Sequence, residues 1–162
     1  MPETPVSERS LPHNLEAEKA VLGAVLIHNE QFNIAVELIN PQDFYRHAHQ
    51  QIFDKMISLS ERNEGIDLVT LKEELDRAGN LNEVGGPAYI AALVDGVPKS
   101  TNVEYYAKIV KEKATLRSLI GSANKILTTA YQAEADASEQ LDLAGQAIFQ
   151  TVSYTHLRAH ET

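Results

Sequence analysis

Two histidines close together in this 162-residue sequence, His47 and His49, are of a type that could carry chemistry. Histidine serves as a metal ligand and as a general acid or base. The two lie two positions apart, so a helix would place them on different sides, and no nearby carboxylate stands at a spacing typical of a metal site. A helical metal-dependent hydrolase that uses both is an alternative that this spacing does not favour. Partly packed polar residues at a helix start are the simpler interpretation.

Two carboxylate pairs, Glu16 with Glu18 and Glu73 with Glu74, could share acid and base roles, but solvated helix faces carry such pairs as well. None of the eight glycines belongs to a GxxxxGK[ST] loop, so the sequence predicts no cradle for nucleotide phosphates. The absence of cysteine excludes a disulfide framework, a thiolate zinc site and a cysteine nucleophile. We therefore predict no catalytic, cofactor-binding or metal-binding residue in this chain.

The charge of the chain is divided into blocks. The net charge is −9, which argues against a grip on nucleic acid along the whole sequence. Residues 99–133 carry six basic and two acidic side chains, whereas residues 134–150 carry four acidic and none that is basic. A basic segment followed by an acidic one suggests two elements that fold against each other. Solvated faces without mutual preference explain the same pattern.

Apolar residues recur at helical spacing along most of the chain, and no stretch alternates as a strand would. Residues 14–98 are predicted to form a head of about five helices. Asn14 and Asp67 are expected N-caps, and Pro41 is an expected stop. The apolar face of the third helix is expected to begin at Phe44, and Pro87 is expected in the first turn of the fifth.

The longest predicted helix begins after Asn102 and continues for roughly 29 residues, a rod of about 43 Å that is too long for a compact head. Asp136, with Glu139 three residues later, resembles an acidic capping box and predicts a last helix. The two helices are the basic and acidic segments. The predicted fold is all-α, a helical head followed by a projecting antiparallel helical hairpin over residues 99–150.

The two ends of the chain are expected to lie outside this fold. Residues 1–13 carry three prolines and few apolar residues, so we predict a flexible N-terminal arm. Residues 152–162, VSYTHLRAHET, can be back-translated into a string that resembles a transposon-end adapter of sequencing libraries. We therefore expect 151–162 to be an adapter-derived or artefactual tail, with a natural C-terminal tail as the alternative. The sequence shows neither an apolar run of membrane-spanning length nor a signal peptide, so a cytoplasmic location is predicted.

Short motifs occur in order between Leu11 and Gln150: LEAEKAVLGA from Leu15, DFY from Asp43, HQQIF from His49, IDLVTL from Ile66, VGGPAYI from Val84 and NVEYYAKIV from Asn102. Together they resemble the N-terminal domain of bacterial replicative DNA helicases of the DnaB type. The departure from the whole family is that the RecA-like motor domain, with its P-loop and DNA-binding loops, is absent from this sequence.

The resemblance implies a function in DNA replication. In the family, hairpins of neighbouring subunits pair, and three such dimers form a collar on the hexameric motor ring. The collar recruits primase and guides single-stranded DNA, and a helicase loader is a further expected partner. ATP and Mg²⁺ belong to the motor domain, so the parent would be an ATP-dependent 5′–3′ helicase and this fragment would be inactive alone. The alternative is a free-standing helical adaptor that binds a helicase, loader or primase.

The resemblance also assigns surfaces to particular residues. By motif match, the primase-facing positions are Glu16, Tyr89, Ile120 and Ile126. The last three also fit core-facing helical positions, so packing within the chain remains open for them. The positions expected in hairpin self-association are Tyr106, Val110, Leu119, Ala123, Leu127, Leu141 and Ile148.

Overall fold

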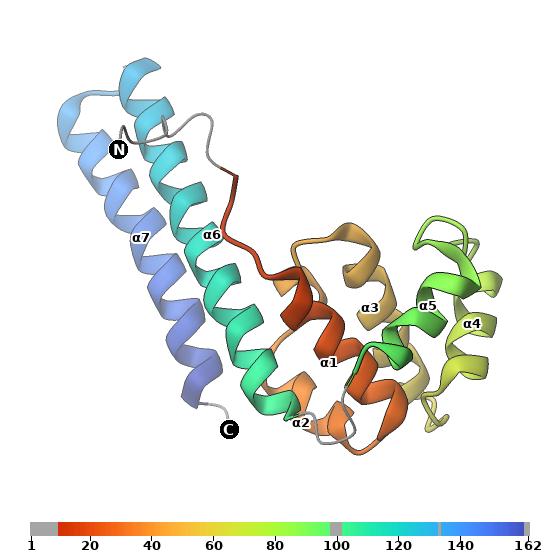
Figure 1. Cartoon of the computed structure of the whole chain (residues 1–162). Helices are drawn as coiled ribbons and strands as arrows, with labels where there is room; N and C mark the ends of the chain where they lie inside the picture. The colour runs from red at the N-terminus through yellow and green to blue at the C-terminus, as the bar shows by residue number, and fades with distance from the viewer. Residues whose placement is uncertain (1–9, 98–101, 133, 161–162) are drawn as a thin grey trace, which may run out of the picture.

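The chain is described by a computed structural model over residues 10–97, 102–132 and 134–160, with side chains through Val152. Within these ranges the regular structure consists of seven α-helices and one 3₁₀ turn, with no strand. Figure 1 shows a cluster of helices, α1 to α5, beside a long hairpin formed by α6 and α7. The predicted all-α fold of a head and a helical hairpin is thereby confirmed. None of the helices in the described ranges is both long and apolar enough to cross a membrane.

The first two helices begin and end where local signals place them. Helix α1 spans Leu15–Ile27, and its cap is the side chain of Asn14, whose Oδ1 accepts a hydrogen bond from the Ala17 amide at 3.0 Å. Helix α2 spans Gln31–Leu38 and ends before Pro41, as predicted.

The segment between α2 and the third helix differs from the prediction. Pro41–Asp43 form the 3₁₀ turn η2, in which the amide of Asn40 donates to Asp43 Oδ2 at 2.9 Å. Helix α3 starts only at His47 and spans His47–Glu61. Phe44 was expected within this helix, which is wrong, because the turn directs its extended backbone inward and buries its ring at 1% exposure.

Helices α4 and α5 complete the head. Helix α4 spans Leu68–Arg77 behind the predicted cap Asp67, and α5 spans Gly86–Asp95 with proline in its first turn. Gly85 precedes α5 with a φ of 113°, a left-handed conformation that favours glycine. A Cβ at this position would also lie only 2.8 Å from the Cβ of Tyr89.

The hairpin consists of α6, Val103–Gln132, and α7, Ala137–His160. Asn102 and Asp136 cap the two helices as predicted, because their side-chain oxygens accept amide hydrogen bonds three residues ahead, at 3.2 and 2.8 Å. The helical backbone of α7 continues to His160, through most of the segment set apart as a tail. Where that segment comes from stays a prediction, and its last two residues lie outside the described part of the chain.

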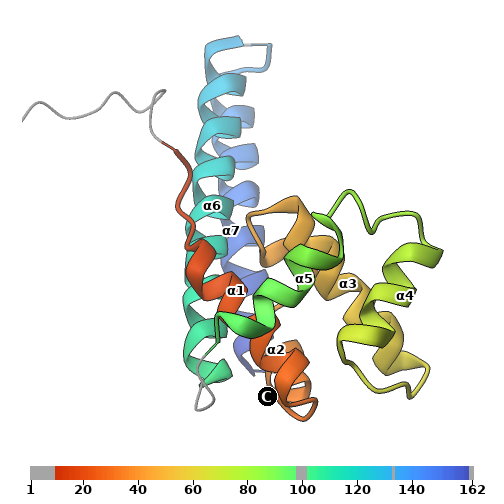
Figure 2. The same ribbon diagram turned by 45° about the vertical axis from the view of Figure 1, so that its right-hand side comes forward.

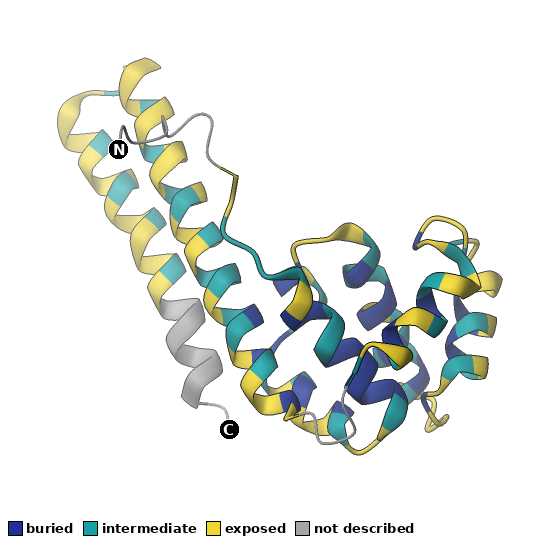
Figure 3. Cartoon of the chain, viewed as in Figure 1, coloured by how far each residue is buried: buried dark blue, intermediate teal, exposed yellow. Residues whose placement is uncertain are grey.

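The core lies in the head and reaches only the base of the hairpin. On α6 the buried residues are Val103, Ala107 and Val110, and beyond Val110 no described side chain of α6 or α7 is buried (Figure 3). Figure 2 shows from a second direction that the hairpin extends well past the head. Beyond Val110, the described side chains of the hairpin are therefore left partly or fully exposed.

Arg117 joins the hairpin to two other parts of the chain. Its Nη1 donates to the Pro12 carbonyl at 2.8 Å and its Nη2 to the Asp43 carbonyl at 2.6 Å, while its Cζ lies 5.5 Å from the Tyr45 ring centroid. His13 stacks on the same ring, with centroids 4.3 Å apart. This stack and the Arg117 hydrogen bond contact Pro12 and His13, at the described end of the predicted arm, and the flexibility of that arm stays a prediction. Residues 1–9 lie outside the described chain.

We expect Arg117→Ala to release the Pro12–His13 segment and to loosen the contact between hairpin and head. Two charge-assisted hydrogen bonds and a cation–π contact would be lost, a destabilisation of roughly 1–3 kcal/mol. Hydrogen exchange should report faster exchange in residues 10–14 and around η2. Lys125→Ala, on the exposed outer part of α6, is the matched control and should leave exchange there unchanged. Unaltered exchange in Arg117→Ala would contradict the assignment.

Candidate interaction surfaces

The head has a cavity of about 260 Å³ between α1 and α5. It is lined by Glu16, Lys19, Ala20, Tyr89, Ala92, Leu93, Gly96 and Val97. Two residues predicted to face a partner, Glu16 and Tyr89, are thus brought together although 73 positions separate them in the sequence. The walls combine an aromatic ring and aliphatic side chains with one acidic and one basic group.

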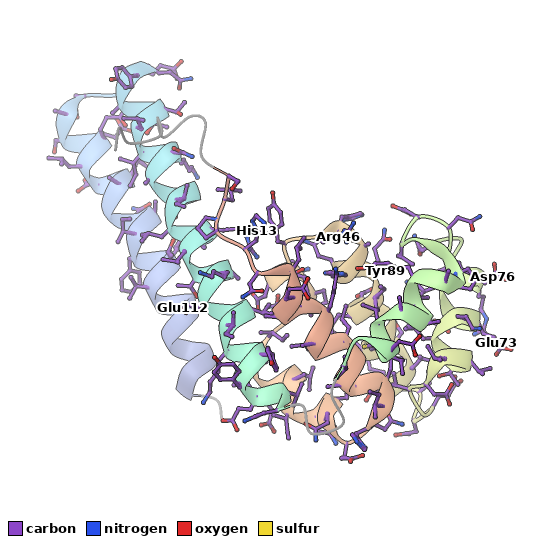
Figure 4. All side chains as sticks on the ribbon, in the orientation of Figure 1. His13, Arg46, Glu73, Asp76, Tyr89 and Glu112 are labelled. Carbon is purple, nitrogen blue, oxygen red and sulfur yellow. The ribbon has the colours of Figure 1, made fainter. Side chains whose placement is uncertain are left out.

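Tyr89 is held firmly at the edge of this cavity. Its hydroxyl lies 2.6 Å from His49 Nε2 and accepts a hydrogen bond from Arg46 Nη1 at 3.2 Å. The guanidinium carbon of Arg46 lies 5.5 Å from the Tyr89 ring centroid, and Figure 4 shows the two side chains together beside α3. Tyr89 is half-buried, so its ring both packs within the head and reaches the surface.

Glu18 lies beneath this site and caps a helix other than its own. Helix α3 has no side-chain cap from its own N-terminal residue. Glu18 Oε2 accepts from the Tyr45 amide at 2.7 Å, and Oε1 lies 3.4 Å from the Arg46 amide and 2.7 Å from His49 Nδ1. The carboxylate therefore stabilises the positive end of the α3 dipole from α1.

The interpretation of Glu18 as part of a solvated face is wrong, because its side chain is buried at 1% exposure. His49, at 0% exposure, is completely packed rather than partly packed. A signal for both was present in the sequence. Glu18 lies three residues before Val21 on the apolar face of α1, and His49 lies three before Ile52 on the apolar face of α3.

His47, the other histidine considered for chemistry, lies apart from Glu18 and His49. His47 is exposed and lies 3.7 Å from Glu83. Hydrogen bonds from Asn80 and Gln51 lower the pKa of Glu83, and the charge of His47 adds to this shift. The described residues contain no group of histidines and carboxylates that could hold a metal ion.

The pair of Glu73 and Glu74 is divided between solvent and a contact that joins two helices. Glu73 is exposed and points outward from α4 in Figure 4. Glu74 accepts two hydrogen bonds from the Arg62 guanidinium at the end of α3, and these bonds lower the pKa of its carboxyl group. The two carboxylates therefore do not form one site.

Ile120 and Ile126 lie on α6, away from the cavity of the head. Both are half-buried, and Ile126 lines a hollow of about 170 Å³ between the two arms of the hairpin. The structure therefore places the four predicted partner-facing residues on two surfaces. Glu16 and Tyr89 meet on the head, and the two isoleucines lie on the hairpin.

The residues predicted for hairpin self-association also divide into two groups. Val110 is 2% exposed in the core of the head, and Tyr106 packs against that core, so packing within the chain occupies both. The other five are exposed. With neighbours that the prediction missed, they form what we call the hairpin apolar face: Leu116, Leu119, Ala123 and Leu127 on α6, and Leu141, Ile148 and Phe149 on α7.

The two stripes of this face lie on one side of the hairpin. The seam between the arms is marked by the hydrogen bond of Ser122 with Thr151, at 2.7 Å, and by that of Gln140 with the Thr129 carbonyl, at 3.2 Å. A helix turns by 100° per residue. On both helices, the apolar residues are rotated away from the seam residues in the same direction around the helix axis. Because the two helices are antiparallel, equal rotation places both stripes on the same side.

Comparison with known proteins identifies relatives along nearly the whole chain. The replicative DNA helicase DnaB of Geobacillus stearothermophilus is 44% identical over 150 residues, which are 93% of this chain and 33% of that protein. The replicative DNA helicase DnaC of Bacillus subtilis (strain 168) is 39% identical over 156 residues, 96% of this chain and 34% of that protein. The chain thus spans about a third of the length of these relatives.

Solved structures of helicases are also similar to this chain. The N-terminal domain of DnaB helicase from Mycobacterium tuberculosis superposes with a TM-score of 0.83 at 38% identity, covering 87% of this chain and 99% of that one. A DnaB-like replicative helicase, described together with its interactions with primase, superposes with a TM-score of 0.71 over 85% of this chain and 31% of its own. At 22% identity, the second shows the fold alone. Residues 10–112 match the family described as the DnaB-like helicase N terminal domain, so this chain belongs to that family.

Proposed function

We propose that this chain is the N-terminal collar domain of a replicative, ATP-dependent 5′–3′ DNA helicase that acts in the primosome. The membership of the family and the longer helicase relatives support this proposal. The observation that carries it is the hairpin apolar face, which exposes large side chains such as Leu141, at 73%, and Phe149, at 70%. An apolar surface of this kind on a projecting element is typical of an interface between proteins.

Self-association through the hairpin gives this face a partner of the right chemistry. A second copy carries the same apolar stripes, and a two-fold interface brings each stripe against its equivalent. Burial of Leu127, Leu141 and Phe149 between two copies would stabilise a hairpin dimer at about 25 cal/mol for each Å² removed from water. Three such dimers would form the collar of a hexamer.

The head is proposed to dock primase through the cavity between α1 and α5. Glu16 and Tyr89 line that cavity, and Ile120 and Ile126 would add a second contact on the hairpin. A helicase loader and single-stranded DNA would bind to the assembled helicase. ATP and Mg²⁺ would be bound by a motor region outside these 162 residues, because the sequence contains no GxxxxGK[ST] loop.

We expect the double variant Leu127→Asp/Leu141→Asp to prevent self-association while the chain stays helical. A symmetric dimer would bury four added carboxylates, so the dissociation constant should rise by about a hundredfold or more. Light scattering across a concentration series measures the oligomeric state, and circular dichroism checks the helical content. Thr128→Asp/Gln146→Asp adds the same charge on the other side of the hairpin and should associate like the wild type. Equal weakening by both pairs would exclude this face as the interface.

Three observations test the wider proposal. The wild-type chain should bind the primase of the same organism in isothermal titration calorimetry, and should show no ATP turnover by itself. The genomic reading frame past Gln150 should continue into a linker helix and then a GxxxxGK[ST] loop. A frame that ends without such a loop would favour a free-standing adaptor over a helicase domain.

A further inference from the structure

We infer that His49 is a positioning residue for the docking surface of the head, because it fixes the hydroxyl of Tyr89 from inside the core. The inference rests on the proposed docking function of the head and concerns the residues that prepare it. It assigns a positioning role to Glu18 and His49, whose side chains are buried at 1% and 0% exposure.

The geometry is a chain of hydrogen bonds that runs from the core to the surface. Glu18 Oε1 lies 2.7 Å from His49 Nδ1, and His49 Nε2 lies 2.6 Å from the Tyr89 hydroxyl. The three residues belong to α1, α3 and α5, so the chain also joins three helices. Tyr89 alone reaches the cavity, and the other two can influence a partner only through it.

The hydrogen-bonding roles follow from the chemistry of the groups. An ionised carboxylate can only accept, so Nδ1 of His49 carries the hydrogen that Glu18 receives. In the neutral ring, Nε2 then accepts from the Tyr89 hydroxyl, whose oxygen still accepts from Arg46. In the charged ring, Nε2 donates to that oxygen instead. The hydroxyl is therefore tied inward in both states, and the ring of Tyr89 is what faces a partner.

Further contacts restrict the same ring. Tyr89 packs close to Gly85, where an added Cβ would meet its Cβ at 2.8 Å and its Cγ at 3.0 Å. Arg46 lies over the ring, with its guanidinium carbon 5.5 Å from the centroid. A ring fixed by packing and by its hydroxyl loses little conformational entropy when a partner binds, so the hydrogen bond to His49 should improve affinity through preorganisation.

Two substitutions separate this role from a purely structural one. In His49→Asn, the amide nitrogen takes the place of Nδ1 and still donates to Glu18, but nothing reaches Tyr89. In His49→Gln, the amide oxygen takes the place of Nε2 and still accepts from Tyr89, but the bond to Glu18 is lost. Both variants leave one buried hydrogen bond unmade, so stability alone does not explain a difference in binding between them.

We expect His49→Asn and Tyr89→Phe each to weaken binding of the primase by roughly fivefold to tenfold, and His49→Gln to stay within about twofold of the wild type. The double variant of His49→Asn with Tyr89→Phe should bind no worse than either single variant, because both remove the same bond. Tyr105→Phe changes an exposed tyrosine at the base of the hairpin and is the matched control. Affinities are compared by titration calorimetry, at a temperature where circular dichroism shows each variant folded. Equal affinity of His49→Asn and His49→Gln would overturn the inference.

A second measurement does not depend on the primase. In nuclear magnetic resonance spectra of the free chain, the Tyr89 hydroxyl proton should be protected from exchange in the wild type and in His49→Gln. It should lose this protection in His49→Asn, and the ring should flip faster. If the wild type fails to bind primase while this pattern holds, the docking function is wrong and the positioning of Tyr89 is right. Identical protection and flip rates in the two variants would overturn the positioning itself.

Discussion

Glu18→Ala is expected to lower the free energy of unfolding of the chain by about 3–5 kcal/mol. The substitution removes the acceptor of the partly buried Tyr45 amide and of the fully buried His49 ring, and leaves both donors without that partner. It also removes the negative charge at the N-terminus of α3, a helix without a side-chain cap of its own. Because Glu18 joins α1 to α3, these losses should weaken the packing of the two helices against each other.

The measurement is urea unfolding followed by circular dichroism, at a protein concentration low enough to keep the chain monomeric. Glu18→Gln keeps one acceptor oxygen for the Tyr45 amide, and the His49 ring can change tautomer to accept from the new amide nitrogen. It should therefore cost only about 1–2 kcal/mol. Glu16→Ala, with a side chain 89% exposed, should change stability by less than about 0.5 kcal/mol. A loss of under about 1 kcal/mol in Glu18→Ala would refute the capping role.

Helix boundaries in this chain were predictable because their causes are local. Asn14, Asp67, Asn102 and Asp136 each accept a hydrogen bond from an amide three residues ahead. A cap of this kind depends only on the order of residues at one helix end, so a pattern within five residues identifies it. Pro41 acts in the same local way at the end of α2.

The features that prediction missed depend on partners far away in the sequence. Glu18 caps α3 from 27 and 28 positions earlier, and its bond to His49 spans 31 positions. The apolar faces of α1 and α3 show that both side chains are buried, but not that they meet. Phe44 was missed for a different, local reason, because the turn at η2 directs it toward the core and helical spacing alone does not show that turn.

The residues predicted for hairpin self-association differ in their exposure. Leu119, Leu127 and Leu141 were predicted as interface residues and are exposed, as an interface between copies requires. Val110 was predicted with them, but the head docks against the base of α6 and buries it. Where the head ends along α6 is a tertiary property, so periodicity could not separate residues that pack on the head from residues left for a partner.

Gly23→Ala is the second change for which we expect a large effect, and its sign is opposite to helix propensity. A Cβ at Gly23 would overlap the Leu93 carbonyl oxygen and a methyl group of Val97, where α1 packs against α5. The carbonyl belongs to the backbone of α5 and cannot rotate away. The two helices must therefore move apart, at a cost of roughly 2–3 kcal/mol in the free energy of unfolding.

Gly121→Ala is the matched control, because an added Cβ there meets nothing within 4 Å on the exposed outer part of α6. Alanine should stabilise that helix by about 0.5–1 kcal/mol, so the same substitution is expected to have opposite signs at the two sites in urea unfolding. Leu93 and Val97 also line the cavity of the head, so separation of α1 and α5 would reshape the proposed docking surface. Gly23→Ala should therefore weaken binding of the primase at temperatures where the chain is still folded. A stabilised Gly23→Ala variant would show that the two helices are not in close contact.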